Sequence, residues 1–360
     1  MRIGIDARLV GRGLGIAQFV TALVSHLSDA AEVVWFGDPA LAPCPVSAVR
    51  FDLLPHPALD LAAARRLARR ARVDVMHFTG NTGWSTSGTP PFVLTVQDML
   101  FVDTPIRGRS MRQILGHRYA RRNVMRAMAV ASAVATPSFA TAAEIGYRAP
   151  LMRGPVVIPY GVDLGPRIGG SGALDGPRGP AGRVPYALAF SGRDPRKGVD
   201  LAIAGWRAAG RMPGPLWLLA GAGLPPGLEQ ELANDLASGQ IVLLPYVTRS
   251  RLYEILTQAH VLLYPSRAEG FGLPVLEAMA VGVPVISGLT PATREVGGDA
   301  ILPIDERAPE ASIAAGLRLI ACDAGVRARL VAAGRRRAES YSWRQCARAY
   351  LDLYEAAAEG

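Results

Sequence analysis

The sequence lacks an apolar run of the length that crosses a membrane. Its longest apolar stretches, 127–135 and 216–224, have the length of buried strands or helices, whereas a membrane-spanning helix needs about 20 consecutive apolar residues. The segment from Met1 to Asp6 is short and contains an acid, so no secretion signal is predicted. We therefore expect a cytoplasmic protein.

Cysteine and paired metal ligands are also scarce. The three cysteines, Cys44, Cys322 and Cys346, lie far apart, which excludes a dense disulfide framework and a CxxC metal clip. His77 and His117 have no second ligand at metal spacing. We interpret both as structural residues, with His77 also a candidate to line a binding site, and we expect neither metal nor cofactor.

Lysine is almost absent, because 38 of the 39 basic residues are arginine and Lys197 is the one lysine. The net charge of +9 is uneven: residues 1–165 hold 18 basic and 11 acidic side chains, and residues 166–360 hold 21 and 19. Two helical stretches, 61–72 with five arginines and 107–126 with seven, carry much of the excess. A basic face of this kind attracts anionic partners.

Two interpretations of the basic stretches stay open. Apolar residues at helical spacing, such as Leu61, Ala64 and Leu67, favour contact with an anionic membrane surface. The alternative is a solvated surface in an arginine-rich protein. Nucleic acid is not an expected partner, because the stretches lack interleaved aromatic residues and no binding module is present.

The order of apolar and amphipathic segments predicts an α/β protein with two doubly wound parallel sheets. With 360 residues the chain suits two domains rather than one core. The expected strands are 3–7, 33–36, 49–54, 73–78, 92–96, 133–136 and 156–159, then 186–190, 216–220, 241–244, 261–264, 283–286 and 300–303.

A stretch rich in Gly and Pro separates the two series and predicts a linker. The expected parts are an N-terminal domain over 1–165, the linker over 166–183, a C-terminal domain over 184–340 and a final helix over 341–360 that could pack on either domain. Ligands of such sheets bind at the carboxyl ends of the strands, so we expect a site in a cleft there.

The segment 260–287 is the most informative, since it predicts a buried strand, a loop, a helix and a second strand. Pro274 suits a first helical position, where its missing N–H costs nothing. The backbone N–H groups of Gly272 and Leu273 would then lie at a positive helix end, which favours phosphate.

Glu269 precedes this turn and Glu277 follows eight residues later, in what we expect to be the first helical turn. Both carboxylates can face one site, and a carboxylate that accepts from two vicinal hydroxyls commonly holds a ribose. For Glu277 taken alone, the favoured interpretation is an acid at a helix N-terminus that the helix dipole stabilises.

The segment AEGFGLPVLEAMAVGVPVI, with its acid, seven residues and second acid, resembles the donor-binding motif of the retaining glycosyltransferases of family four, which have the GT-B fold of two Rossmann-like domains. The resemblance extends in order through IGIDAR, TVQDM, IPYGVD, GRDPRKG and REVGGDAILPID. It therefore covers nearly the whole chain.

The resemblance implies roles for residues of the C-terminal half. Glu269 would contact the transferred sugar, Glu277 the ribose, and Arg193 and Lys197 the diphosphate, as cationic clamps that need no metal. The remaining donor-binding candidates are Gly192, Tyr246, Phe271, Gly272 and Leu273. The single lysine of the chain falls where the motif needs a compact phosphate-binding cation.

The N-terminal half contributes a glycine turn and a polar pair. The turn at Gly11 to Gly15 does not have GxGxxG spacing, and the acid that binds the ribose in a dehydrogenase is missing. The resemblance implies that Gly15 approaches the diphosphate. The alternative is a tight turn between a strand and a helix with no ligand.

Gln97 and Asp98 are the acceptor-side candidates. Many relatives carry His-Asp there, and an amide such as Gln97 can bond a sugar hydroxyl but cannot act as acid or base.

The resemblance implies a retaining, metal-independent glycosyltransferase that moves a hexose or deoxyhexose from a nucleoside diphosphate to a glycan or lipid-linked acceptor, with GDP-mannose as the first candidate donor. A position at the inner membrane face is compatible with the basic domain. The alternatives are a nucleotide-sugar-binding subunit that has lost catalysis, motivated by Gln97, and a GT-B epimerase. A phosphorylase is disfavoured, because Lys197 is the one lysine and cannot both carry a cofactor and clamp phosphate.

Overall fold

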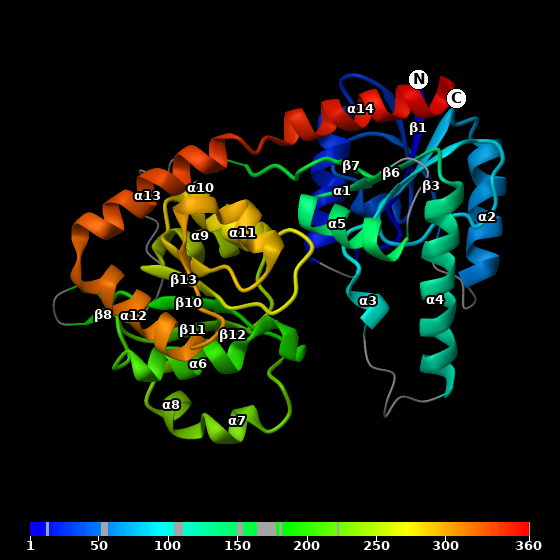
Figure 1. Ribbon diagram of the computed structural model, residues 1–360. Helices are drawn as coiled ribbons and strands as arrows, with labels where there is room; N and C mark the ends of the chain where they lie inside the picture. The colour runs from blue at the N-terminus through cyan, green and yellow to red at the C-terminus, as the bar shows by residue number, and fades with distance from the viewer. Residues whose placement is uncertain are drawn as a thin grey trace. The chain divides into compact units, whose positions relative to one another are not determined.

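The computed structural model describes residues 1–11, 14–51, 57–103, 111–149, 154–163, 178–179, 182–221 and 223–359 (Figure 1). Contacts divide the chain into two compact units, the first formed by Met1–Gly161 and Tyr341–Gly360 and the second by Val162–Ser340. Within the described residues, no helix is both long enough and apolar enough to cross a bilayer.

The first unit contains a seven-stranded sheet in the order β3-β2-β1-β4-β5-β6-β7, and all of its neighbouring pairs are parallel. The strands are β1 (Arg2–Asp6), β2 (Glu32–Phe36), β3 (Ser47–Val49), β4 (Val75–Phe78), β5 (Phe92–Thr95), β6 (Ala133–Thr136) and β7 (Val156–Val157). The order reverses between β1 and β4.

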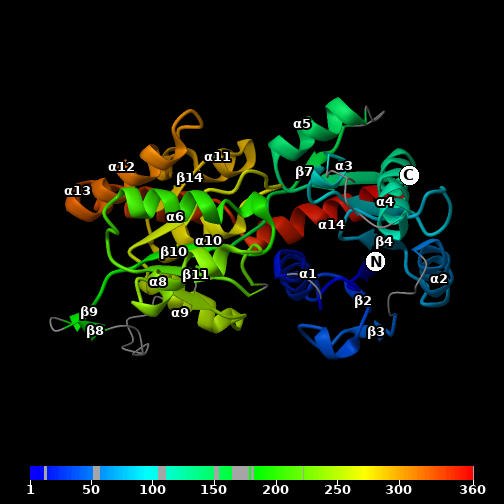
Figure 2. The ribbon, with the colours of Figure 1, turned by 90° about the horizontal axis from the view of Figure 1, so that it is seen from below.

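Helices cover both faces of this sheet. They are α1 (Leu14–Leu27), the 3-10 turn η1 (Pro39–Leu41), α2 (Pro57–Arg70), α3 (Leu100–Asp103), α4 (Met111–Val130), α5 (Phe139–Arg148) and α14 (Trp343–Glu359). Helices α2 and α4 pack on one face through Ala64, Ala68, Val124 and Ala127. On the other face, α14 contacts α1, β4 and β5; Figure 2 shows α14, in red, running beside α1. The last helix is therefore part of the first unit.

The second unit contains a six-stranded parallel sheet in the order β12-β11-β10-β13-β14-β15. Its strands are β10 (Ala187–Phe190), β11 (Leu216–Leu219), β12 (Ile241–Leu244), β13 (Val261–Tyr264), β14 (Val285–Ser287) and β15 (Leu302–Pro303). Here the order reverses between β10 and β13. The predicted class, two doubly wound α/β sheets, is confirmed.

The helices of the second unit also form two layers. They are η2 (Pro195–Lys197), α6 (Val199–Ala208), α7 (Leu228–Glu231), α8 (Ala233–Ala237), α9 (Arg249–Gln258), α10 (Leu273–Val281), α11 (Pro291–Gly297), η3 (Gly298–Ala300), α12 (Pro309–Cys322) and α13 (Ala324–Glu339). Figure 1 shows α6 and α12 on one face of the sheet and α9 and α10 on the other. Val199, Trp206, Ile313 and Leu317 fill the core under the first pair.

Two details differ from the sequence prediction. The edge strand β3 pairs with β2 over Ser47–Val49 rather than running over 49–54, because β2 itself ends at Phe36; residues 52–54 lie outside the described residues. Most of the predicted linker also lies outside them. Its described part is a short antiparallel pair, β8 (Arg178–Gly179) and β9 (Gly182–Arg183), which the composition did not predict.

Candidate functional site

The loops after β10 and β13 hold half of the candidate residues. These two strands are parallel neighbours at the point where the strand order reverses. At this reversal point the loops that follow the two strands turn to opposite faces of the sheet. A crevice for a ligand therefore forms at the carboxyl ends of the strands. Arg193 and Lys197 follow β10, and Glu269 follows β13.

A capped turn shapes the loop after β10. Asp194 accepts a hydrogen bond from the backbone N of Arg196 at 3.0 Å and starts η2. The turn ends at Gly198, whose φ of 66° is left-handed. A Cβ on Gly198 would stand 2.1 Å from the carbonyl oxygen of Pro265, so only glycine lets this loop lie against the loop after β13.

Hydrogen bonds then tie the two loops together. The backbone N of Arg267 donates to the Arg196 carbonyl at 2.7 Å, and Ser266 Oγ lies 3.1 Å from the same oxygen. Arg267 Nη1 also donates to the carbonyl of Pro195 at 3.0 Å. These bonds fix the distance between the side chains that the two loops carry.

Lys197 and Glu269 form an ion pair within this frame. Lys197 Nζ, the Tyr264 hydroxyl and Ser266 Oγ each donate to Glu269 Oε1 at 2.7 Å. The two charged side chains are 25% and 11% exposed, so the pair is mostly covered but open to small ligands.

The partners keep the carboxyl group ionised. Burial raises the pKa of Glu269, but the charge of Lys197 and the hydrogen bonds from Lys197, Ser266 and Tyr264 outweigh it, and the pKa is lowered from its ordinary value of 4.5. Burial and the Glu269 charge raise the pKa of the Tyr264 hydroxyl. At neutral pH Glu269 is therefore an acceptor of hydrogen bonds and not a proton donor.

Helix α10 starts beside this pair. Its N-cap is Gly272, with φ 115° and ψ 44°, and its first residue is Leu273, so Pro274 is the second helical residue and not the first. Phe271 and Leu273 are buried. The first turn contains no acid, and the first backbone N–H groups of a helix favour an anion.

Glu277 lies in the second turn of α10, which corrects its expected place in the first. The helix begins at Leu273 because Gly272 adopts the left-handed cap, and this puts Glu277 five residues into the helix. Its position therefore does not suit a dipole-capping acid. Glu277 is instead buried, 2% exposed, and paired with Arg249 of α9.

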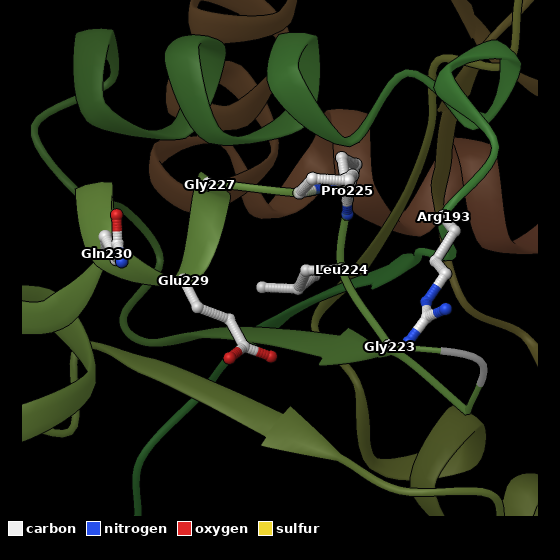
Figure 3. Close-up of a pocket in the computed structure, with 8 residues that line it drawn as sticks. Arg193, Gly223, Leu224, Pro225, Gly227, Glu229 and Gln230 are labelled. Carbon is white, nitrogen blue, oxygen red and sulfur yellow. The ribbon is translucent and has the colours of Figure 1, made fainter.

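Arg193 lies on the same loop after β10 as Lys197. It is exposed and lines a cavity of about 400 Å³ (Figure 3) together with Gly223, Leu224, Pro225, Pro226, Gly227, Glu229 and Gln230. The preceding Gly192 is buried, yet a Cβ added to it would meet no atom within 4 Å. The loop thus has free space beside it.

Two more donor-side candidates lie on exposed backbone. Tyr246, just after β12, is 66% exposed, and its Cα would lie 3.3 Å from a Cβ added to Gly221. Gly15 lies in the first turn of α1, and no atom lies within 4 Å of the place of a Cβ. Both positions leave room for a ligand. Gly15 belongs to the first unit and Tyr246 to the second.

The acceptor-side candidates follow β5 in the first unit. Gln97 Nε2 donates to the Thr79 carbonyl at 2.7 Å, and Gln97 Oε1 accepts from the Tyr160 hydroxyl. Asp98 Oδ1 accepts from the backbone N of Leu100 at 3.1 Å and caps α3. Both ends of the Gln97 amide are thus engaged within the protein, so the side chain acts first as a link between β4, β5 and the segment around Tyr160.

The suggestion that His77 lines a site is wrong, because His77 is fully buried. Its Nε2 is hydrogen-bonded to Thr95 Oγ1 at 2.7 Å, and its Nδ1 to the Tyr354 hydroxyl at 2.7 Å. Burial lowers its pKa to about 3. His77 is a neutral core residue that holds α14, and the sequence hid this role because Tyr354 is 277 residues away.

Sequence reasoning missed Tyr264 and Ser266, and it expected the helix start at 249–255 to lie against the donor base without giving Arg249 or Tyr253 a role of its own. Tyr264 ends a predicted strand directly before the motif, and Ser266 follows, so proximity to Glu269 was a usable signal. The sequence signal for Arg249 was weaker. Arg249 is a cation at the start of a helix, where acids are preferred.

Comparison with known proteins finds a family profile and relatives that match part of the chain. Residues 185–322 match a family profile described as "Glycosyl transferases group 1". The chain is 33% identical over 174 residues to an O-antigen chain mannosyltransferase B of Escherichia coli, covering 47% of this chain and 45% of that protein. It is 37% identical over 127 residues to a D-inositol 3-phosphate glycosyltransferase of Mycobacteroides abscessus, covering 33% and 27%. The matches thus span less than half the length of these curated relatives.

Solved structures resemble the whole chain at low identity. WaaG, a glycosyltransferase involved in lipopolysaccharide biosynthesis, has a TM-score of 0.72 at 16% identity, with 98% of this chain and 99% of that chain covered. Anabaena HepE in complex with UDP-glucose has a TM-score of 0.71 at 17% identity, covering 99% and 100%. At this level of identity the likeness establishes the fold, which is that of these two-domain proteins.

Proposed function

We propose, from the match of residues 185–322 to the group 1 glycosyltransferase profile, that this chain transfers a sugar from a nucleotide sugar to a hydroxyl with retention of anomeric configuration. The observation that carries the proposal is the contact between Lys197 and Glu269 at 2.7 Å, where the strand order reverses. A cation and an ionised carboxylate side by side suit a ligand that has both phosphate and hydroxyl groups.

The donor diphosphate is assigned to the cations and helix end of the second unit. Lys197 is a point charge for one phosphate, and Arg193, next to free space, offers a planar set of donors for the other. The amides from Phe271 to Leu273 lie at the start of α10, where an anion is favoured. Gly192 leaves space beside the same loop.

Three other residues are donor-binding candidates. Gly15 has no atom near its Cβ position, which suits a backbone approach to a phosphate. Glu277 would accept from the ribose hydroxyls, and the exposed Tyr246 would contact the base. These assignments extend the family resemblance residue by residue.

The proposed chemistry is a substitution on one face of the sugar. The bond between the anomeric carbon and the diphosphate oxygen breaks, the acceptor oxygen bonds to the same carbon, and the acceptor proton passes to the departing diphosphate. Lys197 and Arg193 stabilise the charge that develops on the leaving group. Glu269, being ionised, holds sugar hydroxyls rather than supplying a proton.

A protein base is not needed in this scheme, which fits Gln97 as an internally bonded amide. Asp98 remains the acceptor-side candidate of the first unit. The two cations take the place of a metal, so we propose a metal-independent reaction. Transfer in the presence of EDTA should then equal transfer with added Mg²⁺.

The acceptor is proposed to be a glycan or lipid-linked saccharide of bacterial polysaccharide biosynthesis, with the enzyme at the inner face of the membrane. Exposed arginines on α4, Arg118, Arg121, Arg122 and Arg126, support an anionic membrane surface as the partner. The hexose or deoxyhexose donor that we would test first carries GDP, with mannose as the sugar.

A thermal-shift panel of GDP, UDP, dTDP and ADP sugars tests the donor, because a ligand of the folded state raises its apparent stability. Consumption of the stabilising sugar nucleotide with a membrane extract then tests transfer. Binding without consumption would favour a subunit that has lost catalysis. A shift with none of the four would overturn the proposed donor site.

A further inference from the structure

A guanidinium group covers the carboxylate of Glu277. Arg249 Nη2 donates to Glu277 Oε1, and the side chains are 40% and 3% exposed. Arg249 also donates to the Tyr253 hydroxyl at 3.1 Å, and its guanidinium carbon lies 4.8 Å from the centre of the Tyr253 ring. Arg249 is therefore the solvent-exposed member of the pair and Glu277 the buried one.

Local helix preference does not explain an arginine at this place. Arg249 is the first residue of α9, whose first turn contains no acid. The amino end of a helix is positive, so a cation there is unfavourable by about 0.3–1 kcal/mol. A residue that opposes its local preference usually serves a contact or a site, and the contact here is with Glu277.

Opening the pair takes a cation away from a buried carboxylate. A buried carboxylate that loses its cation is strongly destabilised unless other donors take over. Two vicinal hydroxyls supply two donors at a spacing that suits the two oxygens of a carboxylate. The half-exposed Arg249 side chain can move into solvent when they arrive.

We propose that Arg249 is a gate on the Glu277 carboxylate, which the ribose hydroxyls of the bound nucleotide displace. The inference rests on the proposed function, since it takes Glu277 as the ribose acceptor. Arg249 then lowers the affinity for every ribonucleotide. It also makes affinity depend on a vicinal diol, because a ligand without one cannot replace the guanidinium.

Calorimetric titration of the full chain with GDP and UDP, and with their 2′,3′-dideoxy forms, tests the gate. Ribonucleotides should bind to Arg249→Gln about tenfold more tightly than to wild type. In the variant, binding no longer has to break the charge-assisted contact between Arg249 and Glu277. The dideoxy forms should change by less than about twofold. The matched control is Arg251→Gln, two residues further on α9, whose partner is the exposed Glu254; it should behave as wild type.

Two further variants separate the gate from a general loss of structure. Arg249→Lys should shift the affinity in the same direction by a smaller factor, because an ammonium pairs less well with a carboxylate. In a Glu277→Gln background, Arg249→Gln should bring no gain, since the two residues act as one unit. Circular dichroism and a cooperative melt confirm folding of each variant.

The outcomes are distinct. Equal binding of GDP and UDP to wild type and Arg249→Gln would overturn the gate but leave the donor site intact. Weaker binding of the ribonucleotides to Arg249→Gln would also overturn it, by making Arg249 a direct contact of the nucleotide. If neither wild type nor any variant bound a nucleotide, the proposed function itself would fail.

Discussion

Lys197 and Glu269 are 72 residues apart in the chain and meet at 2.7 Å, and Glu269 Oε1 accepts two more hydrogen bonds there. This arrangement fixes one oxygen of an ionised carboxylate. It also places a cation where it can exchange its protein partner for a phosphate. The pair is therefore both a local stabilising contact and, in our proposal, the centre of donor recognition.

Replacing Glu269 by Gln should test the proposed role in transfer. The amide keeps the shape but removes the charge, so sugar hydroxyls lose an ionised acceptor. We expect the turnover number to fall about 10²–10³-fold, while nucleotide affinity changes little. Initial rates of sugar transfer measure the effect. The control is Glu254→Gln, because Glu254 belongs to an exposed ion pair with Arg251 on α9. Unchanged turnover would remove Glu269 from the mechanism.

Gly198 offers a test of how the two loops are held together. Gly198→Ala adds a Cβ 2.1 Å from the Pro265 carbonyl oxygen, at a φ of 66°, so we expect destabilisation of about 2 kcal/mol or more and loss of nucleotide binding. Gly210→Ala is the matched control, because its φ is 78° but nothing lies within 4 Å of its Cβ position. Urea denaturation compares the two; equal losses would mean that only the left-handed backbone matters.

At the scale of elements, α14 is fixed by a buried polar network. Thr95 Oγ1 is hydrogen-bonded to His77 at 2.7 Å and to the Tyr350 hydroxyl at 2.8 Å, and Tyr354 completes the chain on the other side of His77. The His77 and Tyr350 rings stack with centroids 5.0 Å apart. These contacts join the last helix of the chain to β4 and β5.

Tyr354→Phe should therefore weaken the docking of α14. The change removes a hydroxyl from a fully buried site and leaves a ring nitrogen of His77 without that partner, at a cost of about 1–3 kcal/mol. Urea denaturation measures it. Tyr147→Phe, at a side chain that is 88% exposed, should cost nothing measurable; equal effects of both changes would contradict the network.

The same network predicts a pH dependence. Because the folded pKa of His77 is about 3 and its ordinary value 6.5, folding favours the neutral ring. Its contribution is fully present above pH 6.5 and is lost as the pH falls from 6.5 towards 3, at up to about 1.4 kcal/mol per pH unit. His77→Gln should show a flatter fall in unfolding free energy between pH 6 and 4. If unfolding free energy fell with pH in parallel for wild type and His77→Gln, groups other than His77 would account for the pH dependence.

At the scale of the whole molecule, charge differs between the halves of the chain, with 18 basic and 11 acidic residues in 1–165. If the basic excess binds an anionic surface, neutralising two exposed arginines of α4, Arg118→Gln with Arg122→Gln, should weaken binding to anionic vesicles about tenfold or more. The paired control, Arg329→Gln with Arg336→Gln on α13, removes the same charge from the second unit. Vesicle co-sedimentation at low and high salt measures both. Equal losses would indicate a response to net charge alone.

The sequence by itself determined the layered architecture and the loops that carry the candidate site. Alternating apolar and amphipathic segments predicted every strand of the second unit's sheet to within two residues at either end, because burial on both faces demands continuous apolar runs. The motif from Glu269 to Glu277 was readable because its parts are adjacent in the chain. The glycines, the proline and the acids of this motif determine the conformation and charge of the backbone next to them, so a local pattern is enough to recognise them.

Tertiary structure alone decided which side chains meet. Lys197 reaches Glu269 because β10 and β13 are neighbours, Arg249 covers Glu277 because α9 packs on α10, and His77 is buried because α14 contacts β4. Gln97 was expected to face a sugar, and its amide is bonded to Thr79 and Tyr160. Such pairs join residues distant in the chain, and no local pattern encodes them, because strand order and helix docking set their distances.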